Sequence, residues 1–89
     1  MSGQEALGLL ETRGFATMVE ATDTALKAAN VTLVSWERAG SALCTSMFKG
    51  DVAAVTAAVE AGGQAAAKVG DLVSKHIIPN PHEMVRALY

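Results

Sequence analysis

The chain has 89 residues, of which 51% are hydrophobic and 18% are charged, and its formal net charge is −2. This length indicates one domain, residues 1–89, and the acidic balance excludes the basic surface that nucleic-acid binding requires. A domain this small buries only about 60–65% of its unfolded surface when it folds alone. So small a core cannot bury all of these hydrophobic residues. We therefore expect an oligomer that buries the excess apolar surface between its subunits, and the alternative is a monomer with an apolar surface.

The first predicted elements are a strand and a helix. Residues 5–13 are mainly apolar and have the pattern of a strand that Gly14 ends. Asp23 and Lys27 then make a favourable i,i+4 pair on one side of the helix, and Asn30 is predicted to end it in a left-handed conformation. The other side carries one stripe at spacings of 4, 3, 4 and 3, made of Phe15, Val19, Thr22, Leu26 and Ala29.

A hairpin follows in the middle of the chain. Residues 31–39 and 43–49 are predicted strands, and the connection between them is Gly40-Ser41-Ala42. Three residues are an ordinary length for an antiparallel hairpin loop. Because these side chains are so small, the tip is expected to display its backbone amides.

The second predicted helix begins after Gly50, with Asp51 as its N-cap. Gly62 and Gly63 each cost about 1 kcal/mol of helix stability relative to alanine, which indicates a close approach or a bend at this point. The apolar and small residues of this helix recur at alternating spacings of 3 and 4, which is also typical of a coiled coil. Small residues in the stripe favour packing of the helix on a sheet instead. The predicted stripe is Val52, Val55, Val59, Gly62, Ala66, Val69 and Val73.

The last predicted elements are a short strand at residues 75–78, broken by Pro79 and Pro81, and a short helix at residues 83–88. The resulting order is strand, helix, strand, strand, helix, strand and short helix. This order predicts a mixed α/β (α+β) fold of the ferredoxin-like, split βαβ type. Its four-stranded antiparallel sheet would carry two helices on one face, which leaves the other face or the edges for partners.

Cellular compartment is constrained by a few residues. Cys44 is the only cysteine, which excludes an internal disulfide, suits a reducing cytosol and predicts a buried thiol. The first residues are polar, so no secretory signal is expected. The stretch after Asp51 is not expected to span a membrane, because it is interrupted by Glu60, Gln64, Lys68 and Asp71.

With these elements in place, the chain resembles the single-domain, hexamer-forming class of bacterial microcompartment shell proteins, over residues 5–88. Each matching segment is weak alone, and together they are specific in order and spacing. The segments are Ala6-Leu7-Gly8, Glu11-Thr12-Arg13-Gly14, Lys27-Ala28-Ala29-Asn30-Val31, Gly40-Ser41, Gly50-Asp51-Val52, Ile77-Ile78-Pro79 and Pro81-His82.

The resemblance implies a structural protein whose six-fold discs have a central pore. The discs would tile edge to edge into the facets of a shell in the bacterial cytoplasm. The shell would enclose enzymes and pass small polar metabolites. The implied partners are further copies of this chain, other shell proteins and the enclosed enzymes. A ring is physically consistent with the apolar surplus, because a heterologous interface that closes makes a ring.

The resemblance also implies roles for individual residues. Gly40, Ser41 and Ala42 align with the pore loop, where amides and a hydroxyl favour anionic or polar solutes. Relatives often have glycine at the position of Ala42, so its methyl group is expected to narrow or stiffen the loop. A plain hairpin turn is the structural alternative.

The resemblance assigns a second set of residues to the edge where hexamers meet. Lys27 would donate to carbonyls across that edge, and the alternative is a solvated lysine at a helix end. Asn30 would be an edge residue or a helix cap. Asn80 stands where the family commonly has arginine, and asparagine loses that side chain's charge and reach.

The remaining candidate residues give weaker indications of function. Glu37 and Arg38 flank the loop, and strand alternation puts them on opposite faces, so the two pore mouths would differ in charge. His76 and His82 match no metal-ligand spacing, and neither a metal nor a cofactor is expected. Trp36 could be a core residue, a contact between subunits or an exposed residue, and the sequence does not decide among them.

Two other functions compete with a shell role. A ferredoxin-like enzyme would need a nucleophile beside a base or two carboxylates in a cleft, and the acidic residues here are scattered. A regulator would bind a small molecule between the subunits of a trimer. The mass in solution separates these hypotheses.

Overall fold

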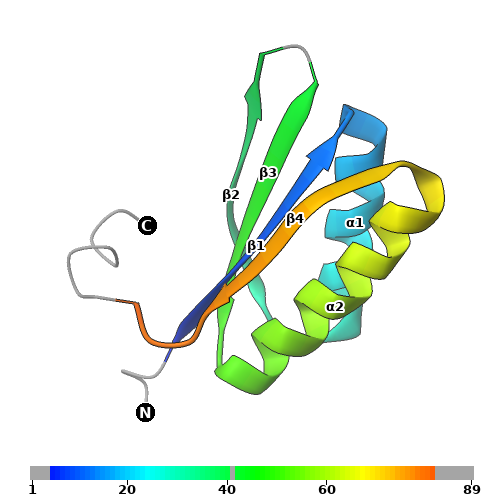
Figure 1. The fold of residues 1–89 in the computed structure, drawn as a ribbon. Coiled ribbons are helices and arrows are strands. Elements are labelled where there is room, and N and C mark those ends of the chain that lie inside the picture. Colours follow the sequence, from blue (N-terminus) through cyan, green and yellow to red (C-terminus); the bar gives the residue numbers. More distant parts are fainter. Residues whose placement is uncertain (1–4, 41, 82–89) are drawn as a thin grey trace.

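The computed structural model describes residues 5–40 and 42–81. A four-stranded antiparallel sheet carries both helices on one face (Figure 1). The helix predicted for residues 83–88 lies outside the described residues. The elements are β1 (Ala6–Arg13), α1 (Phe15–Ala28), β2 (Thr32–Ala39), β3 (Leu43–Gly50), α2 (Val52–Val69) and β4 (Asp71–Ile78).

The strand order is β2-β3-β1-β4, so the hairpin strand β3 and the first strand β1 form the centre of the sheet. In one row across the sheet, Gly8 of β1 lies opposite Phe48 of β3 on one side and Ile77 of β4 on the other. Within residues 5–40 and 42–81, the outer strands β2 and β4 each have one edge that pairs with no other strand. A bulge interrupts β4, because Glu11 pairs with Ser74 whereas Thr12 pairs with Leu72.

Helix α1 begins after Gly14, whose φ of 94° favours glycine. Its buried residues are Thr17, Met18, Ala21 and Ala25. The stripe that the sequence pattern picked out is therefore not the buried one, since Phe15, Val19 and Leu26 are exposed. The reason is steric: the small side chains of Ala21 and Ala25 allow α1 to approach α2 more closely than large ones would.

The end of α1 differs from the prediction for Asn30. The helix ends at Ala28, and Ala29 has an extended conformation. Among the described residues, only glycines have a positive φ, so Asn30 is not a left-handed cap. Instead, the Val31 amide donates to the Ala29 carbonyl and turns the chain directly toward β2.

Helix α2 begins as predicted, because the Asp51 carboxylate accepts a hydrogen bond of 2.9 Å from the Ala54 amide. It ends earlier than the valine spacing predicts. Val73 belongs to β4, which starts at Asp71 and is longer than the strand predicted for residues 75–78. Helical spacing continues through Val73 by coincidence, whereas the chain turns at Gly70.

The predicted close approach at Gly62 is confirmed. A β-carbon there would lie 2.7 Å from Leu10 Cδ1 and 2.8 Å from the carbonyl oxygen of Ala21. At Gly63 the nearest atom would be Leu72 Cδ2 at 3.3 Å. The two helices and β1 thus meet where α2 has no side chain, and the rest of the core is built around Phe48, Val55 and Val59.

Replacing Gly62 tests this packing. Gly62→Ala should lower the free energy of unfolding by about 1–3 kcal/mol, because overpacking outweighs the gain in helix propensity. Gly63→Ala is the matched control, since its neighbour is the end of a flexible side chain. Urea unfolding at one protein concentration measures both. Equal stability of the two variants would contradict the close approach.

Candidate functional site

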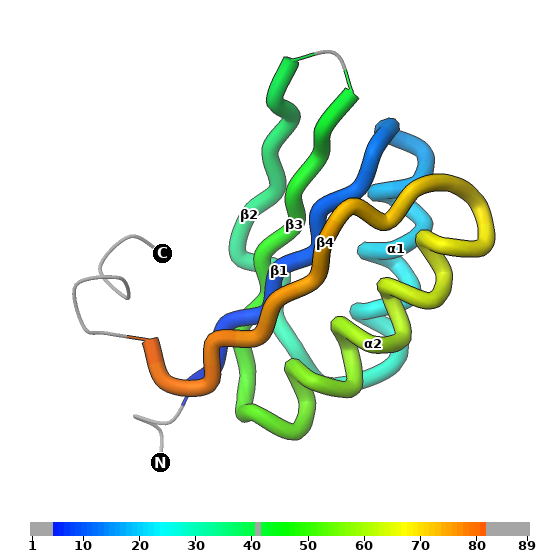
Figure 2. Tube along the Cα trace, viewed as in Figure 1, coloured from blue at the N-terminus to red at the C-terminus, as the bar shows by residue number. Residues whose placement is uncertain are grey.

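Gly40 and Ala42 lie at the tip of the β2–β3 hairpin, where Ala39 pairs with Leu43 (Figure 2). Gly40 is exposed with φ 66°, and a β-carbon there would meet nothing within 4 Å. Ala42 is half-buried, and its carbonyl accepts a 2.6 Å hydrogen bond from the Gly14 amide. Ser41 lies outside the described residues. The loop is therefore anchored at Ala42 and open to solvent at Gly40.

The charged residues beside the loop lie on opposite faces of the sheet, as predicted. Arg38 is opposite Cys44, which is buried under the helices, whereas Glu37 is opposite Thr45. The Arg38 guanidinium carbon lies 5.4 Å from the centre of the Phe15 ring. The helix-side charge is thus held against α1.

An aromatic pair extends this contact. The rings of Phe15 and Trp36 have centroids 5.7 Å apart and are tilted by 58°. Sequence reasoning left Trp36 undecided and did not connect it with Phe15. The available signal was the exposed apolar stripe of α1, which needs a neighbour on the adjacent strand. The cluster of Phe15, Trp36 and Arg38 connects β2 to the start of α1.

Lys27 lies in the last turn of α1, and its Nζ is 2.9 Å from Asp23 Oδ2. This confirms the predicted i,i+4 pair. The hydrogen bond that the Lys27 ammonium donates to the Asp23 carboxylate, followed by the charge of Asp23 and more weakly that of Glu20, raises the pKa of Lys27. The ammonium group therefore stays charged and exposed in the last turn of the helix, where a positive charge is favourable.

Asn30 and Asn80 lie at the same end of the subunit as Lys27. Asn30 precedes β2, and its carbonyl oxygen would lie 3.3 Å from a β-carbon at Gly50, the last residue of β3. Asn80 is exposed and follows β4, whose final residue Ile78 pairs with Leu7. An asparagine at this position thus has access to solvent.

Residues 27, 30 and 80 lie at the same end of the sheet, with Asn30 beside β2 and Asn80 beside β4 on the opposite edge, and the β2–β3 loop lies at the other end. The β2–β3 loop joins the strand ends that lie beside Arg13, whereas Ala6 pairs with Gly50 at the opposite end. Strands of eight residues separate the two ends by about 26 Å. The two predicted sets are therefore separate sites on one subunit.

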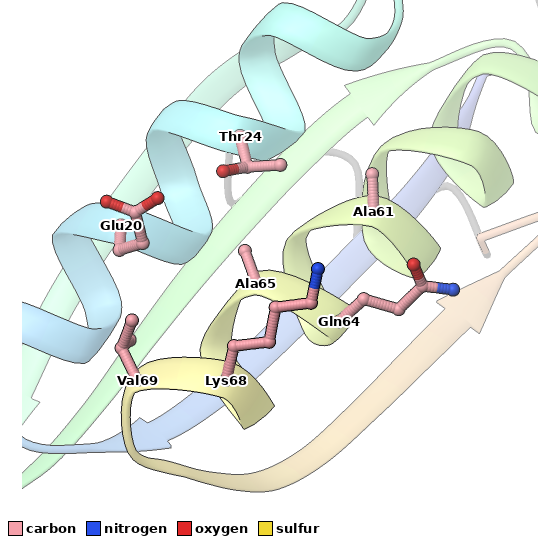
Figure 3. A pocket seen from close by; sticks show the side chains of 7 residues that line it. All are labelled: Glu20, Thr24, Ala61, Gln64, Ala65, Lys68 and Val69. Atoms are coloured by element: carbon pink, nitrogen blue, oxygen red, sulfur yellow. The ribbon is translucent and has the colours of Figure 1, made fainter.

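A further cavity of about 340 Å³ lies between the two helices, away from both sets of residues. Figure 3 shows Glu20 on α1 and Lys68 on α2, with Ala65 between them. The lining includes no nucleophile beside a base and no pair of carboxylates, which are the groups that covalent and acid–base catalysis require. The lining residues are Glu20, Thr24, Ala61, Gln64, Ala65, Lys68 and Val69.

The described part of the chain carries neither a cluster of metal ligands nor a helix that could cross a membrane. Residues 5–40 and 42–81 contain no cluster of three or more His, Cys, Asp or Glu side chains that could hold a metal ion. His76 is exposed on β4, and His82 lies outside the described residues. Cys44 is buried, as predicted. Neither described helix has both the length and the apolar character needed to span a membrane.

The comparisons with known proteins agree on one family. The model of the BMC domain matches residues 6–81. The chain is 54% identical to the bacterial microcompartment shell protein EutM of Salmonella typhimurium strain LT2, over 88% of this chain and 81% of that protein. It is 51% identical to the carboxysome shell protein CcmK2 of Synechocystis sp. strain PCC 6803, over 88% of this chain and 78% of that protein.

A solved structure gives the same result for the fold. The crystal structure of a microcompartment protein from Desulfitobacterium hafniense DCB superposes with a TM-score of 0.83 at 35% identity and covers 92% of this chain. The match covers only 44% of the length of the Desulfitobacterium hafniense protein.

Proposed function

Because the chain belongs to the BMC domain family, with shell proteins of bacterial microcompartments among its relatives, we propose that six copies of it close into a ring that tiles into shell facets. The homologues are structural proteins and not enzymes. The observation that carries the proposal is the family match over residues 6–81. The whole chain, residues 1–89, would act as one shell domain.

The separation of the two predicted sites supports a ring with strands that run from its centre to its rim. Gly40, Ser41 and Ala42 would surround a central pore, while Lys27, Asn30 and Asn80 would face the next ring. This arrangement uses the opposite ends of the eight-residue strands. The strand order β2-β3-β1-β4 with intervening helices supports the ferredoxin-like topology as its scaffold.

The pore loop would select by hydrogen bonding. Six copies of a loop with small side chains bring backbone amides and the Ser41 hydroxyl to one channel, which favours small polar or anionic metabolites. The bond from the Gly14 amide to the Ala42 carbonyl supports a channel wall that is held in position on one side. Glu37 and Arg38 would give the two mouths opposite charges.

The proposed setting is the shell of a microcompartment in the bacterial cytoplasm. Its partners would be further copies of this chain, other shell proteins and the enclosed enzymes. Asn80 is shorter than arginine and uncharged. Contacts between rings would therefore depend more strongly on Lys27, or on another shell protein that supplies the missing charge.

The mass in solution tests the ring. Sedimentation at micromolar concentration should give six copies of the 9.2 kDa chain, a species of about 55 kDa. A stable single chain would contradict the proposal. A trimer that binds a nucleotide would favour the regulator hypothesis instead.

Lys27→Ala should leave the rings intact and abolish extended sheets, because it removes the charged donor at the outer end of the subunit. Electron micrographs show the sheets, and sedimentation shows the rings. Lys68→Ala is the matched control, since Lys68 is an exposed lysine in the last turn of the other helix, at the loop end. Sheets that persist in Lys27→Ala would rule out its edge role.

Ser41→Leu should slow the passage of a small carboxylate such as glycolate at least several-fold, because six leucines would obstruct the channel. The rate can be followed by stopped flow with a pH-sensitive dye enclosed in shells assembled with the other shell proteins. Ser41→Ala removes the hydroxyl without adding bulk and should retain rapid passage. An unchanged rate in intact Ser41→Leu shells would refute the pore assignment.

A further inference from the structure

The cavity between the two helices has the position and size of a small-molecule site. Its lining includes none of the α2 residues that pack inward, such as Val55, Val59 and Gly62, so it opens on the side of the helices that faces away from the sheet. Its volume of about 340 Å³ is near the lower limit of ligand pockets, which measure about 300–1,000 Å³. The cavity therefore suits a small solute.

Small side chains form the floor of this cavity. Ala61 and Ala65 of α2 are half-buried in it, one helical turn apart. The helices approach closely near them, since a β-carbon on Gly62 would lie 2.8 Å from the carbonyl oxygen of Ala21. The axes of two packed helices are about 8–10 Å apart, so one small molecule spans the distance between the walls.

The walls carry one negative and one positive side chain. Glu20 lies on α1 and Lys68 lies on α2, on either side of Ala65 (Figure 3). Both residues are exposed. The three ion pairs formed within residues 5–40 and 42–81 use other side chains. Each of the two charges is therefore available to a ligand.

A neutral hydrogen-bonding group stands beside each charge. Thr24 is one helical turn from Glu20 on α1, and Gln64 is one turn from Lys68 on α2. A hydroxyl can donate or accept a hydrogen bond, and a carboxamide does both. Both walls thus offer more than one polar contact to a charged end of a ligand.

We propose that this cavity binds a small zwitterion, a molecule with an ammonium group at one end and a carboxylate at the other. Its ammonium group donates to Glu20, its carboxylate accepts from Lys68, and its methylene groups lie on the alanine floor. A solute with a single charge binds more weakly, because Glu20 repels an anion and Lys68 repels a cation. Only a zwitterion is attracted by both walls.

This site goes beyond the proposed function and does not depend on it. Both walls belong to one subunit, so a single chain and a ring of six each contain the cavity. Its lining includes neither the loop at residues 40–42 nor Lys27. Binding here is therefore independent of passage through a pore and of contacts between rings.

Binding of 4-aminobutyrate tests the ligand class, because three methylene groups separate its two charges. A titration of the wild-type protein followed by saturation-transfer difference NMR should give a Kd on the order of millimolar, since exposed ion pairs are individually weak. Butyrate lacks the ammonium group and butylamine lacks the carboxylate, and each should bind at least about threefold more weakly. Equal affinities for the three solutes, or no binding of 4-aminobutyrate, would overturn the inference.

Two variants and a matched control locate the site. Glu20→Gln and Lys68→Gln should each weaken the binding of 4-aminobutyrate about fivefold, the effect of one exposed ion pair. Glu37→Gln also removes an exposed carboxylate, but from the sheet face opposite the helices, and it should bind like the wild type. A loss of binding in Glu37→Gln, or full binding in both cavity variants, would show that the ligand binds elsewhere.

Reversing one charge gives the sharpest test. In Glu20→Lys both walls are positive, so butyrate should bind more tightly than it does to the wild type and 4-aminobutyrate more weakly. A wild-type circular dichroism spectrum shows that the variant is folded, as expected for a change at an exposed position. An unchanged order of affinities in the folded variant would refute the inference. A wild type that binds 4-aminobutyrate but sediments as a single chain would refute only the proposed function.

Discussion

The close contact between α1 and α2 is the constraint on which the rest of the subunit depends. Gly62 has no room for a β-carbon against Leu10 and the carbonyl oxygen of Ala21. Because the facing residues are this small, the helices bury alanine and glycine between them and leave larger apolar side chains outside. Phe15, Val19 and Leu26 are exposed for this reason and not because the helix is poorly packed.

The same packing determines where the polar features lie. With both helices on one face, the hairpin tip at residues 40–42 extends from one end of the sheet, and the end of α1 returns to the other. The rigid sheet thus presents a loop and a charged helix end about 26 Å apart. A subunit of this shape has two ends and two lateral edges, and the ring that we propose would give each a distinct role.

Most of the sequence-based predictions that were wrong concern features set by contacts between residues far apart in the chain. The valine spacing of α2 continued to Val73, but the turn at Gly70 and the pairing of β4 with β1 ended the helix at Val69. Asn30 was expected to cap α1 from its own backbone preference, whereas the chain leaves the helix through an extended Ala29. Local propensity is a weak guide when tertiary packing sets the direction of the chain.

The sequence alone predicted the order of the elements, the Asp51 cap and the three-residue hairpin connection, because these depend on residues close together in the chain. It also carried the family resemblance, which depends on the order of short segments. The packing of α1 against α2, in contrast, selects the stripe of α1 that is buried and the stripe that faces outward. Both stripes are compatible with a helix, and the choice between them is made by the shape of α2, whose Gly62 accepts the small residues of α1 and excludes the large ones.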